Sequence, residues 1–461
     1  MATPPNIVFI LADDLGYGDF SSINQGLSHT PVLDQLMAEG TCLTQQYTAS
    51  PVCNPSRACL LTGRYPHRTG SIDTLEWRGL ERLALRETTL AEVLQSSGYR
   101  TGLVGKWHLG AFDDRYRPQN RGFDDAVCFR GGMHDYYQWR IEFGDTVRRG
   151  DGRYLTDVWT EEACQFIRRN QSDPFFLHVT YNAPHTPLQA PEEAIQPFRE
   201  KGQFNEGVST LYGMIECMDR GVGQILETLR SCGLEENTLV CFTSDNGPQF
   251  GGKHSLDRFN CQLHGAKGAV YEGGIRVPMI LRWPSGLEGG RQLDAMVHFS
   301  DWFPTLLSMA DLEPPRGLSL DGVDVSSILQ GEGGNPCEKH YWQWNRYTPR
   351  VESNAAARDG PWKLVCPAMT EAMEVFCADP WLQVSMYEPE RLEEAGLLPD
   401  PWPCPDLPEP PPPELYNLEM DPTESNNLAD DHPDIAHRLL VQLENWFESV
   451  EKDRATIDDV W

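Results

Sequence analysis

The sequence lacks the features that mark membrane-spanning and signal-bearing proteins. No apolar run approaches the roughly 20 residues that a membrane-spanning helix needs. The stretch from Met1 to Leu11 has no basic segment ahead of its apolar residues, which a secretory signal peptide would carry. We therefore expect a cytoplasmic protein with no membrane partner. An exported precursor whose signal peptide has been removed is the alternative.

Paired cysteine motifs are also missing. The chain has 13 cysteines, an odd number at scattered spacings, and no CxxC pair of the kind that binds zinc or cycles between thiol and disulfide. This pattern fits a reducing compartment better than a disulfide-rich secreted fold. Apart from Cys53, the cysteines, including Cys42, Cys59 and Cys128, are interpreted as packing residues.

Positive charge is scarce. The chain has 38 Lys and Arg against 68 Asp and Glu, for a formal net charge of −30. No basic stripe exists to neutralise phosphates, which excludes nucleic acid as a default partner. The acidity favours solubility, but it repels anions at long range. Any site for an anionic substrate must therefore gather its own cations.

Apolar runs alternate with helix-like stretches along the chain. Asn6–Ala12, Phe175–Tyr181 and Thr238–Thr243 are rich in branched and aromatic residues and predict strands buried on both faces. Between them, Thr89–Ser97 and Leu211–Cys232 have apolar residues at helical spacing. The alternation predicts an α/β fold with a large, mainly parallel sheet flanked by helices.

Each predicted strand runs into a polar turn. Asp13 and Asp14 follow the first strand, a turn with His185 follows the second, and Asp245 and Asn246 follow the third. In open parallel sheets, ligands bind beyond the carboxyl ends of the strands. The three turns therefore predict one polar site assembled from distant segments.

A chain of 461 residues is too long for one small core, so we expect a large domain and a smaller one. We place the large domain at 1–331 and a smaller α+β domain at 332–461, with a strand-like segment at Trp362–Val365. Residues 397–413 are rich in proline and acid and predict an extended surface connection. A terminal helix is expected from about Ile435. It docks either on its own domain or on a partner, which leaves the oligomeric state open.

Cys53 lies in the most informative stretch, Ser50–Arg64. It precedes a turn containing Pro55 and a helix that is expected to start near Ser56. The N-terminus of a helix offers free N–H groups and a positive dipole end, which suit an anion or an activated nucleophile. A lone cysteine in such a place is more often a buried structural residue.

The residues around Cys53 form a longer pattern. Cys53-x-Pro55-Ser56-Arg57, followed by Leu60-Leu61-Thr62-Gly63-Arg64, resembles the modification motif of the formylglycine-dependent sulfatases of the alkaline phosphatase superfamily. Further segments resemble that family in the same order: Asn6–Asp14, Gly98–His108, Asp245–Gly247, Lys267–Pro278 and Glu414–Pro422. The resemblance spans nearly the whole chain. It implies an alkaline phosphatase-like fold and hydrolysis of a small aryl or sugar sulfate ester.

The resemblance implies one Ca²⁺ per chain. Its ligands would be Asp13, Asp14, Asp245 and Asn246, together with an oxygen of modified Cys53. Calcium prefers hard oxygen ligands, several of them charged, so these side chains suit it. For any one of the aspartates taken alone, a solvated turn or a helix cap is the simpler interpretation.

The resemblance also implies that a maturation enzyme oxidises Cys53 to formylglycine (3-oxoalanine), whose hydrate is the nucleophile. In this family pattern Arg57, Lys106 and Lys267 stabilise the charge on the sulfuryl group. His108 assists release of sulfate, and His185 with Lys267 protonates the leaving alcohol. Arg64, Glu272 and Arg276 are interpreted as scaffold residues.

Two other functions remain open from the sequence. One is a phosphodiesterase or phosphonate monoester hydrolase of the same superfamily, which tends to have Asp-His where this chain has Asp245-Asn246. Asparagine suits calcium whereas histidine suits transition metals, so the pair favours sulfate. The other is a non-catalytic protein that binds a sulfated ligand and keeps Cys53 as a thiol. Arg130–Trp139, with His134, and Trp342–Trp344 are candidates for stacking on a substrate ring or for hydrophobic packing.

Overall fold

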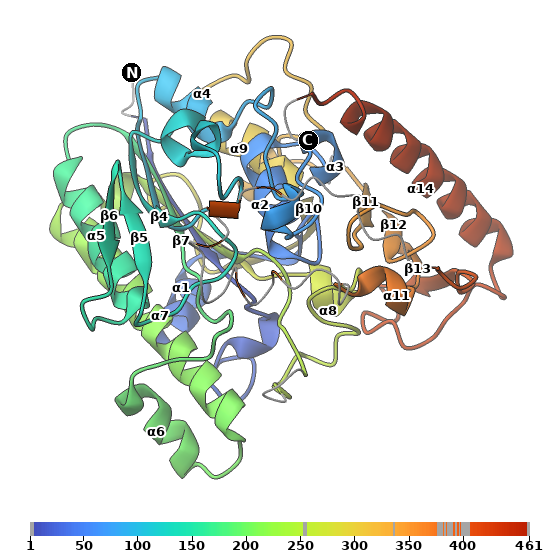
Figure 1. Ribbon diagram of the computed structural model, residues 1–461, viewed down its shortest axis with the longest axis horizontal. Coiled ribbons are helices and arrows are strands. Elements are labelled where there is room, and N and C mark those ends of the chain that lie inside the picture. The colour runs from blue at the N-terminus through green and yellow to red at the C-terminus, as the bar shows by residue number, and fades with distance from the viewer. Residues whose placement is uncertain are drawn as a thin grey trace.

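A ten-stranded sheet runs through the computed structural model, which describes residues 4–251, 256–334, 337–375 and 406–458 and a few isolated positions from 381 to 397 (Figure 1). The strand order is β10-β2-β9-β8-β1-β7-β3-β4-β5-β6. The strands are β1 (Asn6–Ala12), β2 (Thr41–Tyr47), β3 (Arg100–Lys106), β4 (Asp125–Phe129), β5 (Arg140–Phe143), β6 (Thr146–Arg149), β7 (Phe175–Thr180), β8 (Thr238–Ser244), β9 (Met279–Arg282) and β10 (Arg291–His298).

The centre of the sheet is parallel, as the sequence predicts. β1 pairs in parallel with both β7 and β8, and β3 pairs in parallel with β7 and β4. β9 is antiparallel to its neighbours, and β5 and β6 form an antiparallel edge. Leu11 lies opposite Thr180 on one side and Thr243 on the other, so the three central strands end at the same level. Their polar turns therefore meet.

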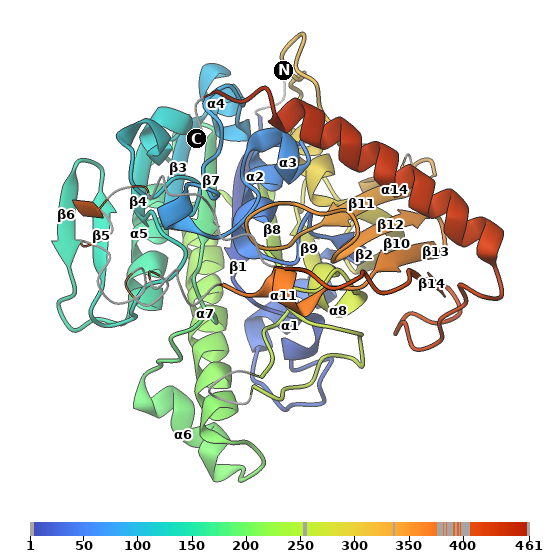
Figure 2. The ribbon, with the colours of Figure 1, turned by 45° about the vertical axis from the view of Figure 1, so that its right-hand side comes forward.

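Helices cover both faces of the sheet. Val8 and Ile10 of β1 pack with residues of α1 (Pro31–Glu39), α5 (Leu155–Arg169) and α7 (Glu206–Ser231). Ile7 and Phe9 point to the other face, among residues of α2 (Cys53–Thr62), α4 (Leu90–Ser96) and α9 (Trp302–Met309). Figure 2 shows α5 and α7 on one side of the central strands and α2 on the other. Burial on both faces explains why the strands are continuously apolar.

The other helices whose bounds lie within the described ranges are α3 (Pro66–Thr69), α6 (Glu192–Glu200), α8 (Glu272–Ile275), α10 (Ser326–Leu329), α11 (Thr370–Met373) and α14 (Pro433–Arg454). Short 3-10 turns, among them η2 (Glu76–Arg78), connect the larger elements. No helix within the described ranges is both long enough and apolar enough to cross a membrane.

Helix starts differ from the expected ones in two places. α2 begins at Cys53 itself and not near Ser56, because the backbone N–H groups of a first helical turn have no intrahelical acceptor and Pro55 costs nothing there. α7 begins at Glu206, ahead of the expected Leu211, because the Asn205 side chain accepts a hydrogen bond from Val208 N and caps it. α4 starts as expected, with a capping box between Thr89 and Glu92.

A second, four-stranded antiparallel sheet follows in the chain: β11 (Lys339–Gln343), β12 (Ala355–Asp359), β13 (Trp362–Cys366) and β14 (Glu414–Asn417). α14 lies along this sheet, at the right of Figure 1, with Leu439, Leu443 and Val450 fully buried against it. The terminal helix therefore docks on its own chain. In the proline-rich connection, 398–405 lie outside the described residues, and 406–413 form neither helix nor strand.

A buried ion network joins the two sheets. Lys363 of β13 has its Nζ 2.9 Å from Glu272 Oε1 of α8 and 2.8 Å from Glu424 Oε1. The Tyr47 hydroxyl at the end of β2 donates to Glu272 Oε2 at 2.7 Å. Glu272 thus holds the junction between the sheets through two buried partners.

Candidate active site

The three polar turns converge beyond the ends of β1, β7 and β8. All four predicted ligand side chains are buried, Asp13, Asp245 and Asn246 completely and Asp14 almost so. His185 lies beside them with its Nε2 3.8 Å from Asp14 Oδ2. Asp14 adopts a left-handed backbone conformation with φ of 68°. The structure therefore brings together the strand-end residues that the sequence predicts.

Cys53 opens α2 at the centre of this group and is 3 % exposed. Its Sγ and one carboxylate oxygen each of Asp13 and Asp245 lie within 4.8 Å of one another. Burial raises the pKa of the Cys53 thiol, although Lys106 acts in the opposite direction. An uncharged thiol is a weak nucleophile. The geometry therefore gives Cys53 a central place, while its chemistry as a thiol is poor.

Three cations each contact a carboxylate of the site. Arg57 Nε donates to Asp245 Oδ2 at 2.8 Å, and Lys106 Nζ donates to Asp13 Oδ2 at 2.7 Å. Lys267 Nζ lies 2.7 Å from Asp14 Oδ1. Arg57 and Lys106 are buried, and the Lys267 side chain is 16 % exposed. The chain concentrates positive charge here despite its strongly acidic composition.

The cations decide the ionisation of Asp13 and Asp14, which follow β1. Burial acts to raise the pKa of Asp13, but Lys106 and its neighbours bring that pKa below its ordinary value. Burial likewise opposes Lys267 at Asp14, whose pKa is also lowered. Burial and the charge of Asp13 raise the pKa of Asp245 to about 6. All three groups are therefore carboxylates at neutral pH.

Two histidines face the cluster as neutral imidazoles. His108 Nδ1 lies 3.3 Å from Cys53 Sγ, and burial together with Lys106 holds the His108 pKa well below its ordinary value. His185 Nδ1 lies 2.7 Å from the Thr186 carbonyl oxygen, so Nδ1 carries the proton and Nε2 faces Asp14. Burial and Lys267 lower the His185 pKa.

Two buried oxygens of the cluster lack a protein partner. Asp13 Oδ1 and Asn246 Oδ1 accept no hydrogen bond among the described residues. Asn246 Nδ2 donates to Asp14 Oδ1 at 2.8 Å, which turns the amide oxygen to a fixed side. Buried acceptors without donors are costly unless a cation or water meets them. Hard oxygens with several negative charges fit a calcium-type ion.

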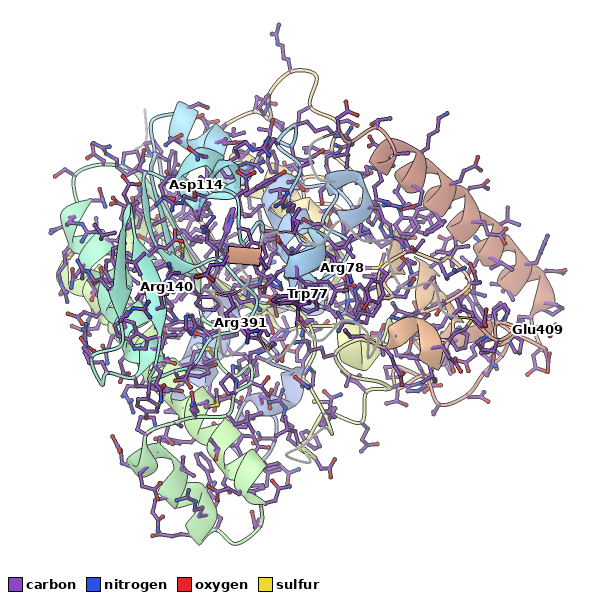
Figure 3. All side chains as sticks on the ribbon, viewed as in Figure 1. Trp77, Arg78, Asp114, Arg140, Arg391 and Glu409 are labelled. Atoms are coloured by element: carbon purple, nitrogen blue, oxygen red, sulfur yellow. The ribbon has the colours of Figure 1, made fainter. Side chains whose placement is uncertain are left out.

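The structure adds residues that sequence reasoning missed. Arg258 is buried, donates to the Asp14 carbonyl oxygen, and has its Nε 3.3 Å from Asp19 Oδ1. Glu76 of η2 reaches within 3.9 Å of His108. Figure 3 labels the next two residues, Trp77 and Arg78, near the centre of the view beside α2. Neither Arg258 nor Glu76 lies in a motif, so only the fold reveals them.

The two segments expected to stack on a substrate ring or to pack in the core, Arg130–Trp139 and Trp342–Trp344, have different surroundings. Trp342 is completely buried and its Nε1 donates to the Thr48 carbonyl oxygen at 2.7 Å, so it packs in the core. His134, in contrast, lines a narrow crevice of about 40 Å³ whose other walls include Glu76, Arg130 and Arg140. This crevice runs beside the residues that contact His108.

Comparisons with known proteins identify relatives of the whole chain. The family model described as Sulfatase matches residues 5–312, and the model described as N-sulphoglucosamine sulphohydrolase, C-terminal matches residues 264–391. The chain is 33 % identical to N-acetylgalactosamine-6-sulfatase of Sus scrofa over 396 residues, 74 % of this chain and 72 % of that protein. It is 29 % identical to arylsulfatase J of Mus musculus over 468 residues, 95 % and 75 % of the two chains.

Solved structures extend the likeness. The structure of Ps i-CgsB in complex with k-i-k-neocarrahexaose matches with a TM-score of 0.80 and 30 % identity, covering 96 % of this chain and 93 % of that one. The phosphonate monoester hydrolase of Agrobacterium radiobacter matches with a TM-score of 0.63 at 21 % identity, covering 98 % and 96 % of the two chains, and shares the fold.

The Sulfatase model matches residues 5–312, and the relatives match most of the chain. The chain therefore belongs to the sulfatase family of the alkaline phosphatase superfamily. Within that class it is a sulfuric ester hydrolase.

Proposed function

We propose that the chain hydrolyses a sulfate ester of a sugar, using formylglycine made from Cys53 and one Ca²⁺. The observation that carries the proposal is the buried group of three cations and four oxygen-bearing side chains at the first turn of α2. In this group the ligand atoms of Cys53, Asp13 and Asp245 lie within 4.8 Å of one another. Maturation by a formylglycine-generating enzyme is part of the proposal.

Asp13, Asp14, Asp245 and Asn246 would hold the Ca²⁺, together with an oxygen at position 53. The unpartnered oxygens of Asp13 and Asn246 support this assignment, because a cation would satisfy both. Bound Ca²⁺ would favour the ionised form of the hydroxyl nucleophile that the formylglycine hydrate supplies, and would offset charge on the substrate.

The protein's own residues orient the substrate and move protons. His108 Nδ1 faces position 53 and is neutral, so it can accept a proton from a group there. Arg57 and Lys106, buried beside the carboxylates, stabilise negative charge that grows on sulfuryl oxygens. His185 Nε2 and Lys267 Nζ both face Asp14, and we assign both to the leaving oxygen. Lys267 supplies the proton, because neutral His185 carries its own proton on Nδ1 and only contacts that oxygen.

A sugar sulfate is the substrate class that the relatives support. Ps i-CgsB binds an oligosaccharide, and N-acetylgalactosamine-6-sulfatase is named for a sulfated sugar. Turnover of a panel of sulfated sugars against simple aryl sulfates checks this. Sugar sulfates are expected to have the higher kcat/KM; a preference for simple aryl sulfates would contradict the sugar assignment.

The central test combines chemistry and turnover at position 53. Mass spectrometry of the Cys53 peptide is expected to show the aldehyde, and Cys53→Ala is expected to abolish hydrolysis of an aryl sulfate. Cys59→Ala is the matched control, because it removes a buried thiol from the same helix at a residue outside the cluster. Full activity of Cys53→Ala would refute the mechanism. A strong preference for an aryl phosphodiester over the aryl sulfate would instead favour the superfamily's phosphorus chemistry.

A further inference from the structure

Glu76 completes a line of polar groups behind Cys53. The imidazole of His108 lies between the two: Nδ1 is 3.3 Å from Cys53 Sγ, and Nε2 is 3.9 Å from Glu76 Oε1. His108 is 1 % exposed and Glu76 is 7 % exposed. His108 Nε2 has no hydrogen-bond partner among the described residues. The Glu76 carboxylate is the group placed to accept a hydrogen bond from an Nε2–H.

The backbone at Gly132 allows Glu76 and His108 to approach each other. Gly132 N donates to Glu76 Oε1, and a Cβ at position 132 would lie 2.7 Å from His108 Cε1 and 3.1 Å from Glu76 Oε1. A side chain there would push the two groups apart. Asn54 Nδ2 donates to the carbonyl oxygens of both Glu81 and His108, at 2.7 Å each. The start of α2 thereby holds His108 and the segment that follows Glu76 in one frame.

We propose that Glu76 is a positioning residue that holds His108 as the Nε2–H tautomer and leaves Nδ1 free to accept a proton from the group at position 53. This inference rests on the function proposed above. It adds Glu76 to the pair formed by His108 and the group at position 53. A carboxylate behind a histidine selects the ring tautomer and stabilises the imidazolium that forms when the ring takes up a proton. Hydrogen bonds of this kind are often long before substrate binds.

The neighbouring Glu81 supplies a control. Burial and the proximity of Glu76 raise the pKa of Glu81 to about 8, so it is mostly uncharged at neutral pH. Its Oε1 accepts from Ala111 N at 3.3 Å. Burial raises the Glu76 pKa to about 7, while the Gly132 N–H and Lys106 favour its charged form. Glutamine at position 81 therefore alters a carboxyl group bonded to Ala111 N, whereas glutamine at position 76 alters the carboxyl group that faces His108 Nε2.

The test compares Glu76→Gln with Glu81→Gln by two readouts. A glutamine amide offers an oxygen and an N–H₂ group to His108 and so supports either tautomer. In Glu76→Gln, kcat for an aryl sulfate is expected to fall about 10- to 100-fold with little change in KM. Glu81→Gln is expected to keep the wild-type kcat. Nitrogen-15 NMR of the His108 ring, in protein whose Cys53 is unmodified, is expected to show the Nε2–H form in wild type and a raised Nδ1–H fraction in Glu76→Gln.

The NMR arm needs neither metal nor formylglycine, so its result is independent of the proposed function. Wild-type kcat in Glu76→Gln, or the same tautomer ratio as wild type, would overturn the role of Glu76. Absence of the aldehyde from active wild-type protein would overturn the proposed function instead. Gly132→Ala is the second variant if Glu76→Gln does not fold, because its Cβ would crowd both the His108 ring and Glu76 Oε1 and force them apart. It is expected to give the same loss of kcat, and an unchanged kcat would count against the proposal.

Discussion

At the scale of single residues, the two polar atoms of the Asn246 side chain have separate roles. Its Nδ2 donates to Asp14 Oδ1, and its Oδ1 accepts no hydrogen bond from any residue that the structure describes. For the proposed calcium site, we predict that Asn246→Ala lowers Ca²⁺ affinity by at least about tenfold, because the proposed ligand oxygen and the hydrogen bond to Asp14 are both lost. Isothermal titration of metal-free protein measures this.

Asn246→Asp is the matched control for that substitution. It keeps a ligand oxygen at the same place and should retain more of the Ca²⁺ affinity than alanine does. Stabilisation against heat by added Ca²⁺ should follow the same order, because a ligand stabilises the folded state in proportion to its binding. Equal Ca²⁺ affinity in wild type and Asn246→Ala would show that the ion is held elsewhere.

Two buried histidines away from the cluster make the fold sensitive to acid. Burial, aided by Arg57, lowers the pKa of His178 to about 3, and burial, aided by Arg358, lowers that of His340 to about 3. In the unfolded chain a histidine has a pKa of about 6.5. The unfolded state therefore binds more protons between these values, so this stability is complete above about pH 6.5 and is lost as pH falls towards 3.

The size of the effect follows from linkage. Between pH 7 and pH 5.5, each of the two histidines should cost about 1.2 kcal/mol of the free energy of unfolding. Urea denaturation at the two pH values measures it. His178→Gln removes one contribution, so its stability should fall less over this interval than that of wild type. Parallel pH dependence in the two proteins would contradict the assignment to His178.

At the scale of helices and strands, α14 is an outer layer on the small sheet. Leu443 is completely buried in that contact, whereas Val441, on the same helix, is 39 % exposed. Leu443→Ala is expected to cost about 2–5 kcal/mol, the range for a large apolar side chain removed from a core. Val441→Ala should be nearly neutral. Thermal denaturation and hydrogen exchange in β11–β14 measure both.

The interior elements could be predicted from sequence because their environment is uniform. β1, β7 and β8 are buried along their whole lengths, so each is a continuous apolar run. β5 and β6 could not be predicted: each has four residues, and every residue of β6 is exposed. The start of α2 was misplaced because proline marks the first turn of a helix as readily as the turn before it.

The same distinction holds for the candidate site. Asp13, Asp245 and Cys53 lie at the ends or starts of elements, inside contiguous motifs, and could be named from the sequence. Glu76 and Arg258 reach the site from connecting segments whose own sequence has no distinguishing pattern. Their contacts depend on how distant segments pack, which local periodicity does not encode.

At the scale of the whole molecule, the net charge of −30 opposes the arrival of any sulfate ester. The cations of the site are buried beside carboxylates, so their attraction acts at close range. Salt screens the long-range repulsion first, because the Debye length falls from about 30 Å at 0.01 M to about 10 Å at 0.1 M ionic strength. Contacts inside a buried site are screened much less.

We therefore predict that kcat/KM for a sulfate ester rises as ionic strength increases over this range, while kcat stays constant. A disulfated sugar carries twice the charge of its monosulfated counterpart, so its kcat/KM should rise more steeply. Initial rates for the two substrates across a salt series, at constant Ca²⁺, measure both slopes. Falling values of kcat/KM would instead mean that the local cations govern the encounter, and that the acidic surface lies too far from the path of the substrate to oppose it.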